Sequence, residues 1–206
     1  PCNRHMVSLF GGQPVAIPVG QDSGYAVPES ALAEVMKDDL RALMVASPAN
    51  PTGNLMDLDM LRTLQRQLSL QSDAVLVCDE IYQGLQYDAE LSTALALGAD
   101  NVVVINSFSK FFGMTGWRVG WVVAPDWMIE PMERLAQNIF LAAPTMGQYA
   151  ALAAFTAETA EILEWRRVKF RERRDFLYGA LRELGFGIDM LPQGAFYLYA
   201  DVSRLA

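Results

Sequence analysis

Histidine and cysteine are scarce in this chain of 206 residues. His5 is the only histidine. A Ser-His-Asp triad or a histidine-rich metal site is therefore not expected, and a hydrolase or a zinc-binding protein is disfavoured. The two cysteines, Cys2 and Cys78, form no CxxC pair, and Cys78 lies in an apolar run where a buried free thiol is the ordinary expectation. A reducing, cytoplasmic location follows as the default.

Positive charge and long apolar segments are also lacking. The formal net charge is −8 and the sequence pI is about 4.6, whereas nucleic-acid-binding proteins concentrate Lys and Arg against the phosphate backbone. No apolar run reaches the roughly 18 residues that a membrane helix needs, and no basic region followed by an apolar stretch marks a signal peptide. We therefore expect a soluble protein that binds neither nucleic acid nor membrane.

Hydrophobic residues, in contrast, make up 52% of the chain, which is enough for a sizeable core. Short apolar runs rich in β-branched residues predict four buried strands, at Leu43–Ala46, Ala74–Cys78, Val102–Ile105 and Val119–Val123. Helical spacing occurs between them, after Glu29 and Ser30 and again from Leu58 to Leu68 behind a capping Asp57. Strands that alternate with helices predict an α/β fold with a mainly parallel sheet covered by helices.

After Pro144 the pattern changes. A long helical stretch is predicted from about Gln148 to Leu184, with a weak interruption near Ala157–Glu161, and a strand is predicted at Ala195–Ala200. The charged middle of the helical stretch, Trp165–Arg174, is basic enough to suggest a nucleic-acid stripe. Apolar residues are interleaved with the charges, however, so we interpret it as a solvated helix face.

Polar residues follow the first three predicted strands. Ser47–Gly53 comes after the first, Asp79–Tyr82 after the second and Asn106–Lys110 after the third. Taken singly, each group has an ordinary structural explanation: a turn, a helix cap or an exposed loop lysine. In open parallel sheets, however, ligands bind beyond the carboxyl ends of the strands, and polar groups at successive strand ends therefore predict a site there.

The segment Ser107–Trp121, SFSKFFGMTGWRVGW, resembles the lysine-bearing signature of class I/II (fold type I) aminotransferases, which depend on pyridoxal 5′-phosphate. The resemblance extends from the first residues of the chain to the last. It implies the aspartate-aminotransferase fold: a three-layer α/β/α large domain at residues 1–143 and the start of a smaller α+β C-terminal domain at residues 144–206. It also implies a homodimer, with an amino acid and a 2-oxo acid as small-molecule substrates.

The same resemblance implies the roles of two residues that would take part in the chemistry. Lys110 would bind the cofactor aldehyde through its amine and later move a proton between the substrate Cα and the C4′ atom of the cofactor. Asp79 would pair with the pyridine nitrogen and keep it protonated, so that the ring withdraws electrons.

The other implied contacts would hold the cofactor in place. Tyr82 and Asn50 would hydrogen-bond its phenolic oxygen. Ser107, Ser109 and Arg118 would bind its phosphate, with Arg118 offering the fork geometry that suits phosphate oxygens. The Asn50–Pro51 peptide bond is expected to be cis, as it often is in the family.

Several parts of the family's pattern are missing. The glycine-rich phosphate loop and the aromatic residue that stacks on the ring would precede or border Pro1, and the substrate-carboxylate arginine would follow Ala206. We therefore expect a fragment that lacks both ends of its parent and is inactive alone.

Alternatives remain within the fold and outside catalysis. A lyase or decarboxylase would share Lys110, Asp79 and Arg118. A non-catalytic effector domain of a transcriptional regulator would bind the cofactor without turnover. A nucleotide-binding domain is disfavoured, because the chain has neither a GxGxxG nor a GxxxxGK[ST] motif.

Overall fold

The chain divides into two units, Pro1–Leu40 and Arg41–Ala206. The structure, a computed structural model, describes residues 2–36, 40–70 and 74–205. The first unit holds two helices, α1 (Cys2–Leu9) and α2 (Glu29–Val35), the second of which matches the helix predicted after Glu29. The second unit holds the sheet, the remaining helices and every residue of the predicted site.

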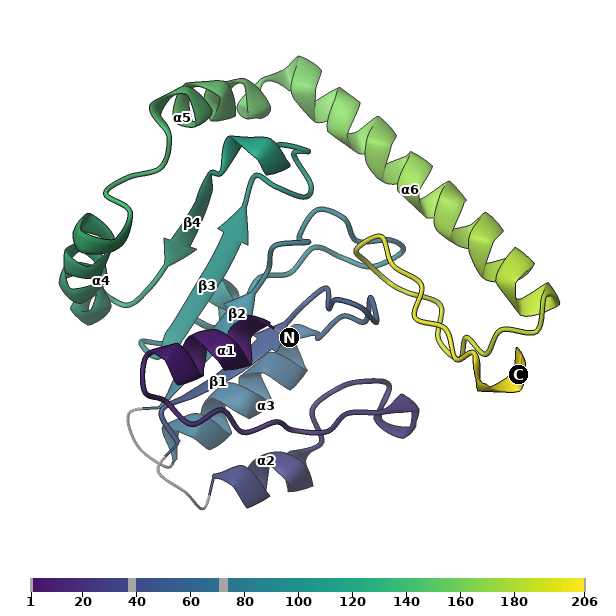
Figure 1. Cartoon of the computed structure of the whole chain (residues 1–206), viewed down its shortest axis with the longest axis horizontal. Helices are drawn as coiled ribbons and strands as arrows, with labels where there is room; N and C mark the ends of the chain where they lie inside the picture. Colours follow the sequence, from purple (N-terminus) through teal and green to yellow (C-terminus); the bar gives the residue numbers. More distant parts are fainter. Residues whose placement is uncertain (1, 37–39, 71–73, 206) are drawn as a thin grey trace. The chain divides into compact units, whose positions relative to one another are not determined.

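One sheet of four strands organises the second unit (Figure 1). Its strands are β1 (Ala42–Ala46), β2 (Val75–Asp79), β3 (Val102–Ser107) and β4 (Gly120–Val123), in the order β1-β2-β3-β4. The first three are parallel, and β4 runs antiparallel to β3. The predicted α/β fold with a mainly parallel sheet is thus confirmed, and the register places Ala46 beside Asp79 and Asp79 beside Ile105. The prediction of a buried strand at Val119–Val123 is wrong in its burial, because all four residues of β4 are exposed.

Helix α3 (Leu58–Ser69) shows why the local predictions succeed. The Asp57 side chain accepts a hydrogen bond from the Met60 amide at 2.8 Å and begins the helix as an N-cap. Leu61, Leu64 and Leu68 are buried on one face of α3, and each contributes about 2 kcal/mol through burial. The sheet itself buries Cys78 as a free thiol, as predicted, and burial raises its pKa to about 12.

Three helices follow β4: α4 (Asp126–Ile139), α5 (Thr145–Leu152) and α6 (Ala157–Glu183). The expected interruption near Ala157–Glu161 is wrong, because those residues form the first turns of α6. The break lies at Ala153–Thr156, where Thr156 adopts an extended backbone and its side chain accepts the Thr159 amide. Among the helices that the structure describes, none is long and apolar enough to cross a membrane.

The charged stretch of α6 is not simply a solvated face, so that interpretation needs correction. Trp165 and Phe176 are 61% and 77% exposed, whereas Arg174 is only 9% exposed. The Arg174 guanidinium can be buried because the Asp88 carboxylate and the Pro192 carbonyl satisfy it. Composition predicts buried apolar residues and an exposed arginine in this stretch, whereas tertiary contacts leave Trp165 and Phe176 exposed and bury Arg174.

The predicted strand at Ala195–Ala200 is also wrong. In the described part of the chain, this region has only single bridges at its margins, Gly194 with Gln86 and Asp201 with Gly187. Ala195 has a φ of +59° and its amide donates to the Leu85 carbonyl, so the backbone turns where a strand would continue. The apolar run at 195–200 predicts a strand, but no neighbouring strand is described that could pair with it.

Residues 192–197, here called the 192–197 segment, connect two loops of the sheet. The Gly53 carbonyl, in the loop after β1, accepts the amides of Gln193 and Gly194 at 2.9 Å each. In the loop after β2, the Leu85 carbonyl accepts the Ala195 amide at 2.9 Å. The approach is close enough that a Cβ atom on Gly53, whose φ is +70°, would lie 2.6 Å from Pro192 Cβ.

Replacing Gly53 with alanine should therefore destabilise the protein by about 2–4 kcal/mol, through backbone strain and overpacking together. Gly98→Ala is the matched control, since Gly98 also has a positive φ, +62°, but no atom lies within 4 Å of a Cβ placed there. Its cost should be about 1 kcal/mol, from strain alone. Urea unfolding of both variants measures the difference, and equal losses would show that the 192–197 segment does not press on Gly53.

Candidate functional site

The predicted site residues lie at the carboxyl edge of the parallel strands. Asp79 ends β2 and Ser107 ends β3, while Asn50 and Lys110 lie in the loops that follow β1 and β3. Both Ser47–Pro48 and Asn50–Pro51 are cis, the second as predicted. Because β1, β2 and β3 are adjacent and parallel, their ends bring these loops to one edge of the sheet.

Lys110 is half-buried among aromatic rings. Its Nζ atom lies 5.6 Å from the centre of the Tyr82 ring and 5.8 Å from that of Phe196. Such cation–π contacts are worth about 1 kcal/mol each. Within the described residues, no carboxylate forms an ion pair with Lys110. The amine is thus held in place without being neutralised by a fixed partner.

Asp79 is a half-buried carboxylate with only a local partner. Its Oδ1 atom accepts the Ile81 amide at 3.1 Å. Burial raises the pKa of Asp79, and the hydrogen bond from Ile81 opposes that effect. No Lys or Arg of the described chain pairs with this carboxylate. A cationic group bound beside Asp79 would favour the ionised form and lower its pKa.

Tyr82 and Asn50 meet through a third residue, Tyr197. The hydroxyls of Tyr82 and Tyr197 are 2.6 Å apart, and Asn50 Nδ2 donates to the Tyr197 hydroxyl at 3.5 Å. Burial is the main cause that raises the pKa of Tyr82, the hydrogen bond with Tyr197 raises it further, and Asn50 lowers it. The amide and the two phenols form one polar cluster beside the rings that flank Lys110.

The two serines form a compact turn after β3. Ser107 Oγ accepts the Ser109 amide at 3.0 Å, lies 2.9 Å from Ser109 Oγ and donates to the Val119 carbonyl at 3.1 Å. Thr115 Oγ1 closes the loop by donating to the Ser109 carbonyl at 2.6 Å. These bonds fix the direction of both hydroxyls.

Arg118 forms no described contact with the two serines. Its guanidinium is exposed and donates to the Thr115 carbonyl at 2.9 Å, and its φ is +55°. None of its described contacts reaches Ser107, Ser109 or Lys110. The structure therefore connects Asn50 with Tyr82 through Tyr197, and Ser107 with Ser109. Most of the Arg118 donors have no described partner and are available to a ligand.

Tyr197 and Phe196 are site residues that the sequence reasoning missed. The sequence places both only in the strand predicted at Ala195–Ala200. Tyr197 is 115 positions away from the Tyr82 hydroxyl that it contacts. No spacing rule links residues so far apart, and the aromatic pair after Gly194-Ala195 was the only available signal.

The comparisons with known proteins decide the family. A family model described as aminotransferase class I and II matches residues 4–206. The chain belongs to this aminotransferase family. The valine–pyruvate aminotransferase of Mycobacterium tuberculosis is 37% identical to this family member, over 98% of the chain and 52% of the relative.

Solved aminotransferase structures agree with the fold. Aspartate aminotransferase from Thermus thermophilus, with maleate, matches with a TM-score of 0.92 and 31% identity over 98% of this chain and 53% of the other. An aminotransferase from Mycobacterium tuberculosis matches with a TM-score of 0.91 and 37% identity over 100% of this chain and 53% of the other. The aspartate-aminotransferase fold is therefore confirmed, and the chain spans about half the length of the curated relatives it matches.

The side chains at the sheet edge fit pyridoxal phosphate, the cofactor of this family. Among the described residues, no carboxylate pairs with the Lys110 amine and no Lys or Arg pairs with the Asp79 carboxylate. An aldehyde suits the amine, a protonated ring nitrogen suits the carboxylate, and a phosphate suits the serine hydroxyls and a guanidinium. When bound, this cofactor withdraws electrons from the substrate Cα and so stabilises negative charge there.

Proposed function

We propose that the site formed around Lys110 serves a pyridoxal-phosphate-dependent aminotransferase, which moves an amino group between an amino acid and a 2-oxo acid. The observation that carries the proposal is the pair of unneutralised groups, the Lys110 amine and the Asp79 carboxylate, at the ends of neighbouring strands in a chain of this family. Charged groups that are partly buried lose hydration and are favoured by partners of opposite charge, so two such groups without a described partner indicate a ligand.

In this proposal the chain's own residues have distinct tasks. Lys110 would hold the cofactor through its aldehyde and, once a substrate amine takes its place, would carry a proton at the substrate Cα. Asp79 would hold the ring nitrogen in its protonated form. The Tyr82 hydroxyl and the Asn50 amide would hold the phenolic oxygen.

Substrate choice forms part of the proposal. No arginine lies between Phe140 and Met146, where dicarboxylate-specific relatives can supply one, and this favours substrates with neutral side chains or a broad range of side chains. The name of the Mycobacterium tuberculosis relative, valine–pyruvate aminotransferase, points in the same direction. A homodimer is also proposed. It is supported by the apolar side chains exposed on β4, α4 and α5, among them Trp121, Trp127 and Met146. A cytoplasmic location, suggested by cysteine usage alone, stays a prediction.

The test is to supply the full-length protein that contains this chain with pyridoxal phosphate and a panel of amino acids that includes valine, alanine and aspartate. We expect a 2-oxo acid to form in step with conversion of the cofactor to its amine form, and to be lost in Asp79→Asn. Asp59→Asn, which changes an exposed carboxylate on α3, should leave the yield unchanged. Release of carbon dioxide or an elimination product would indicate a lyase or decarboxylase, and binding without conversion would indicate an effector domain; either outcome contradicts the proposal.

A further inference from the structure

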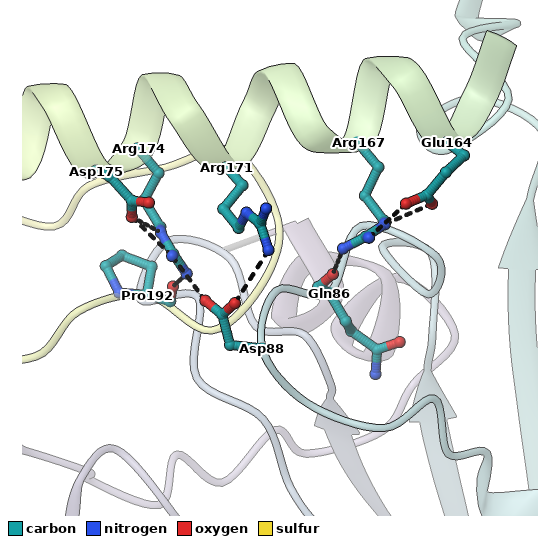
Figure 2. A network of polar contacts seen from close by, with 8 residues as sticks. All are labelled: Gln86, Asp88, Glu164, Arg167, Arg171, Arg174, Asp175 and Pro192. Atoms are coloured by element: carbon teal, nitrogen blue, oxygen red, sulfur yellow. Dashed lines mark hydrogen bonds and ion pairs between the residues drawn. The ribbon is translucent and has the colours of Figure 1, made fainter. Parts of the chain in front are cut away.

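The 192–197 segment delivers Tyr197 to the candidate site, and helix α6 holds that segment. Figure 2 shows the contacts, in which arginines of α6 reach toward the loop after β2 and toward Pro192. Arg167 binds Glu164 through two bonds of 2.6 and 2.7 Å and donates to the Gln86 carbonyl at 2.9 Å. Arg171 contacts Asp88 at 3.3 Å. Both of these arginines hold the loop and do not touch the segment.

Arg174 is the member of the network that reaches the 192–197 segment. Its side chain is 8% exposed, and Nη1 donates to the Pro192 carbonyl at 2.8 Å. Nη2 donates to Asp88 at 2.9 Å and Nε donates to Asp175 at 2.8 Å, so all three guanidinium nitrogens are engaged. A buried guanidinium with this many directed bonds has a single preferred position.

A second contact connects Arg174 to the same segment through Tyr87. The guanidinium carbon lies 4.9 Å from the centre of the Tyr87 ring, and the Tyr87 hydroxyl donates to the Ala195 carbonyl at 2.6 Å. Arg174 thus acts on the segment at two carbonyls, Pro192 directly and Ala195 through Tyr87. Tyr197 follows two residues after the second of these points.

Packing alone does not hold the segment on its α6 side. A cavity of about 300 Å³ lies there, lined by Tyr87, Arg174, Leu177, Phe196 and Tyr197 among others. Phe170 of α6 stacks on Phe196, with ring centres 5.6 Å apart, and is the main apolar contact. Beside this cavity, the bonds of Arg174 and Tyr87 fix the segment at two carbonyls, those of Pro192 and Ala195.

We propose that Arg174 is a positioning residue for the candidate site: it holds the 192–197 segment so that the Tyr197 hydroxyl stays on the Tyr82 hydroxyl and orients it. The use of that orientation, donation to the phenolic oxygen of the cofactor, rests on the proposed function. The positioning itself does not rest on the proposed function. Its two contacts, Arg174 with the Pro192 carbonyl and Tyr197 with Tyr82, both lie within the protein.

The readout is the acidity of Tyr82 without cofactor. Because the hydrogen bond with Tyr197 raises the pKa of Tyr82, loosening the segment should lower it. Incorporating 3-fluorotyrosine at all seven tyrosines makes each phenol more acidic. The Tyr82 titration then falls at a lower pH, at which the chain stays folded. Fluorine NMR follows this titration. The Tyr82 signal is assigned from its loss in Tyr82→Phe.

In Arg174→Met the Tyr82 midpoint should fall by about half to one pH unit, the equivalent of one hydrogen bond. Tyr197→Phe should lower it equally, and the double variant should lower it no further, since both changes remove the same contact. Arg171→Met, which loses only the Asp88 contact, should leave the midpoint unchanged. A purely structural role would lower stability in Arg174→Met without moving this midpoint.

If Arg174→Met does not fold, Tyr87→Phe removes only the bond to the Ala195 carbonyl and should shift the midpoint in the same direction. An unchanged midpoint in the folded variant overturns the inference. Uptake of pyridoxal phosphate is measured in parallel. A shifted midpoint in a chain that takes up no cofactor supports the positioning and contradicts the proposed function. Normal uptake with an unchanged midpoint supports the proposed function and contradicts the positioning.

Discussion

Replacing Lys110 with alanine should abolish the attachment of pyridoxal phosphate to the chain that survives borohydride reduction. Reduction converts the bond between an amine and the cofactor aldehyde into a stable secondary amine, so the product marks the lysine that holds the cofactor. Lys110 is the candidate because its Nζ lies against the Tyr82 and Phe196 rings at the sheet edge, with no described carboxylate to neutralise it. Mass spectrometry of the digested chain should find the adduct in a peptide that contains Lys110.

The chain supplies a matched control for this experiment. It has only three lysines, and Lys169 is an exposed residue of α6 that pairs with Glu172 at 2.7 Å. Lys169→Ala should retain the full yield of adduct. If Lys110→Ala is labelled as strongly as the parent chain, the assignment of Lys110 is wrong, and the site must be sought at another amine.

Replacing Arg118 with alanine should weaken binding of pyridoxal phosphate by about ten- to a hundredfold. A charge-assisted hydrogen bond contributes about 1.5–3 kcal/mol, and every 1.4 kcal/mol is tenfold in affinity. The guanidinium is exposed and makes one described hydrogen bond, to the Thr115 carbonyl, so its other donors remain for a phosphate. Arg118→Lys should recover only part of the loss, because an ammonium keeps the charge but lacks the planar fork.

Pyridoxal, which has no phosphate, separates this role from a general loss of the site. Its binding should be nearly the same in the parent chain and in Arg118→Ala, as measured by equilibrium titration of absorbance. Arg134→Ala makes the same charge change on the exposed face of α4, where Arg134 pairs with Glu130, and should alter neither affinity. Equal losses for pyridoxal and pyridoxal phosphate in Arg118→Ala would contradict the phosphate assignment.

The parts of the fold predicted from the sequence are those that depend on neighbours along the chain. The β-branched runs became β1 to β4 with ends displaced by at most two residues, and Asp57 caps α3 through the Met60 amide. Both outcomes depend on residues that are close in the sequence. A short apolar run predicts a strand, and an aspartate before a helix accepts a hydrogen bond from one of the unpaired amides at the helix start. The roles of Lys110, Asp79 and Arg118 came from family resemblance and remain predictions.

The strand predicted at Ala195–Ala200 failed because it depends on long-range pairing. Residues 195–200 have a composition suited to a strand, but Ala195 bonds to Leu85 and turns with a positive φ. Strand propensity reflects a pleated, half-buried setting that neighbouring strands must supply, and it cannot by itself specify one.

By itself, the sequence determined that this chain is an α/β protein of the aminotransferase family, because alternating local patterns and a dense motif around Lys110 need no tertiary knowledge. Only the tertiary structure decided that Arg174 is buried and that Tyr197 meets Tyr82, across 115 positions of sequence. A charged or aromatic side chain has the same local preferences whether it is solvated or buried. Its place depends on which distant carboxylates, carbonyls and hydroxyls the folded chain brings to it.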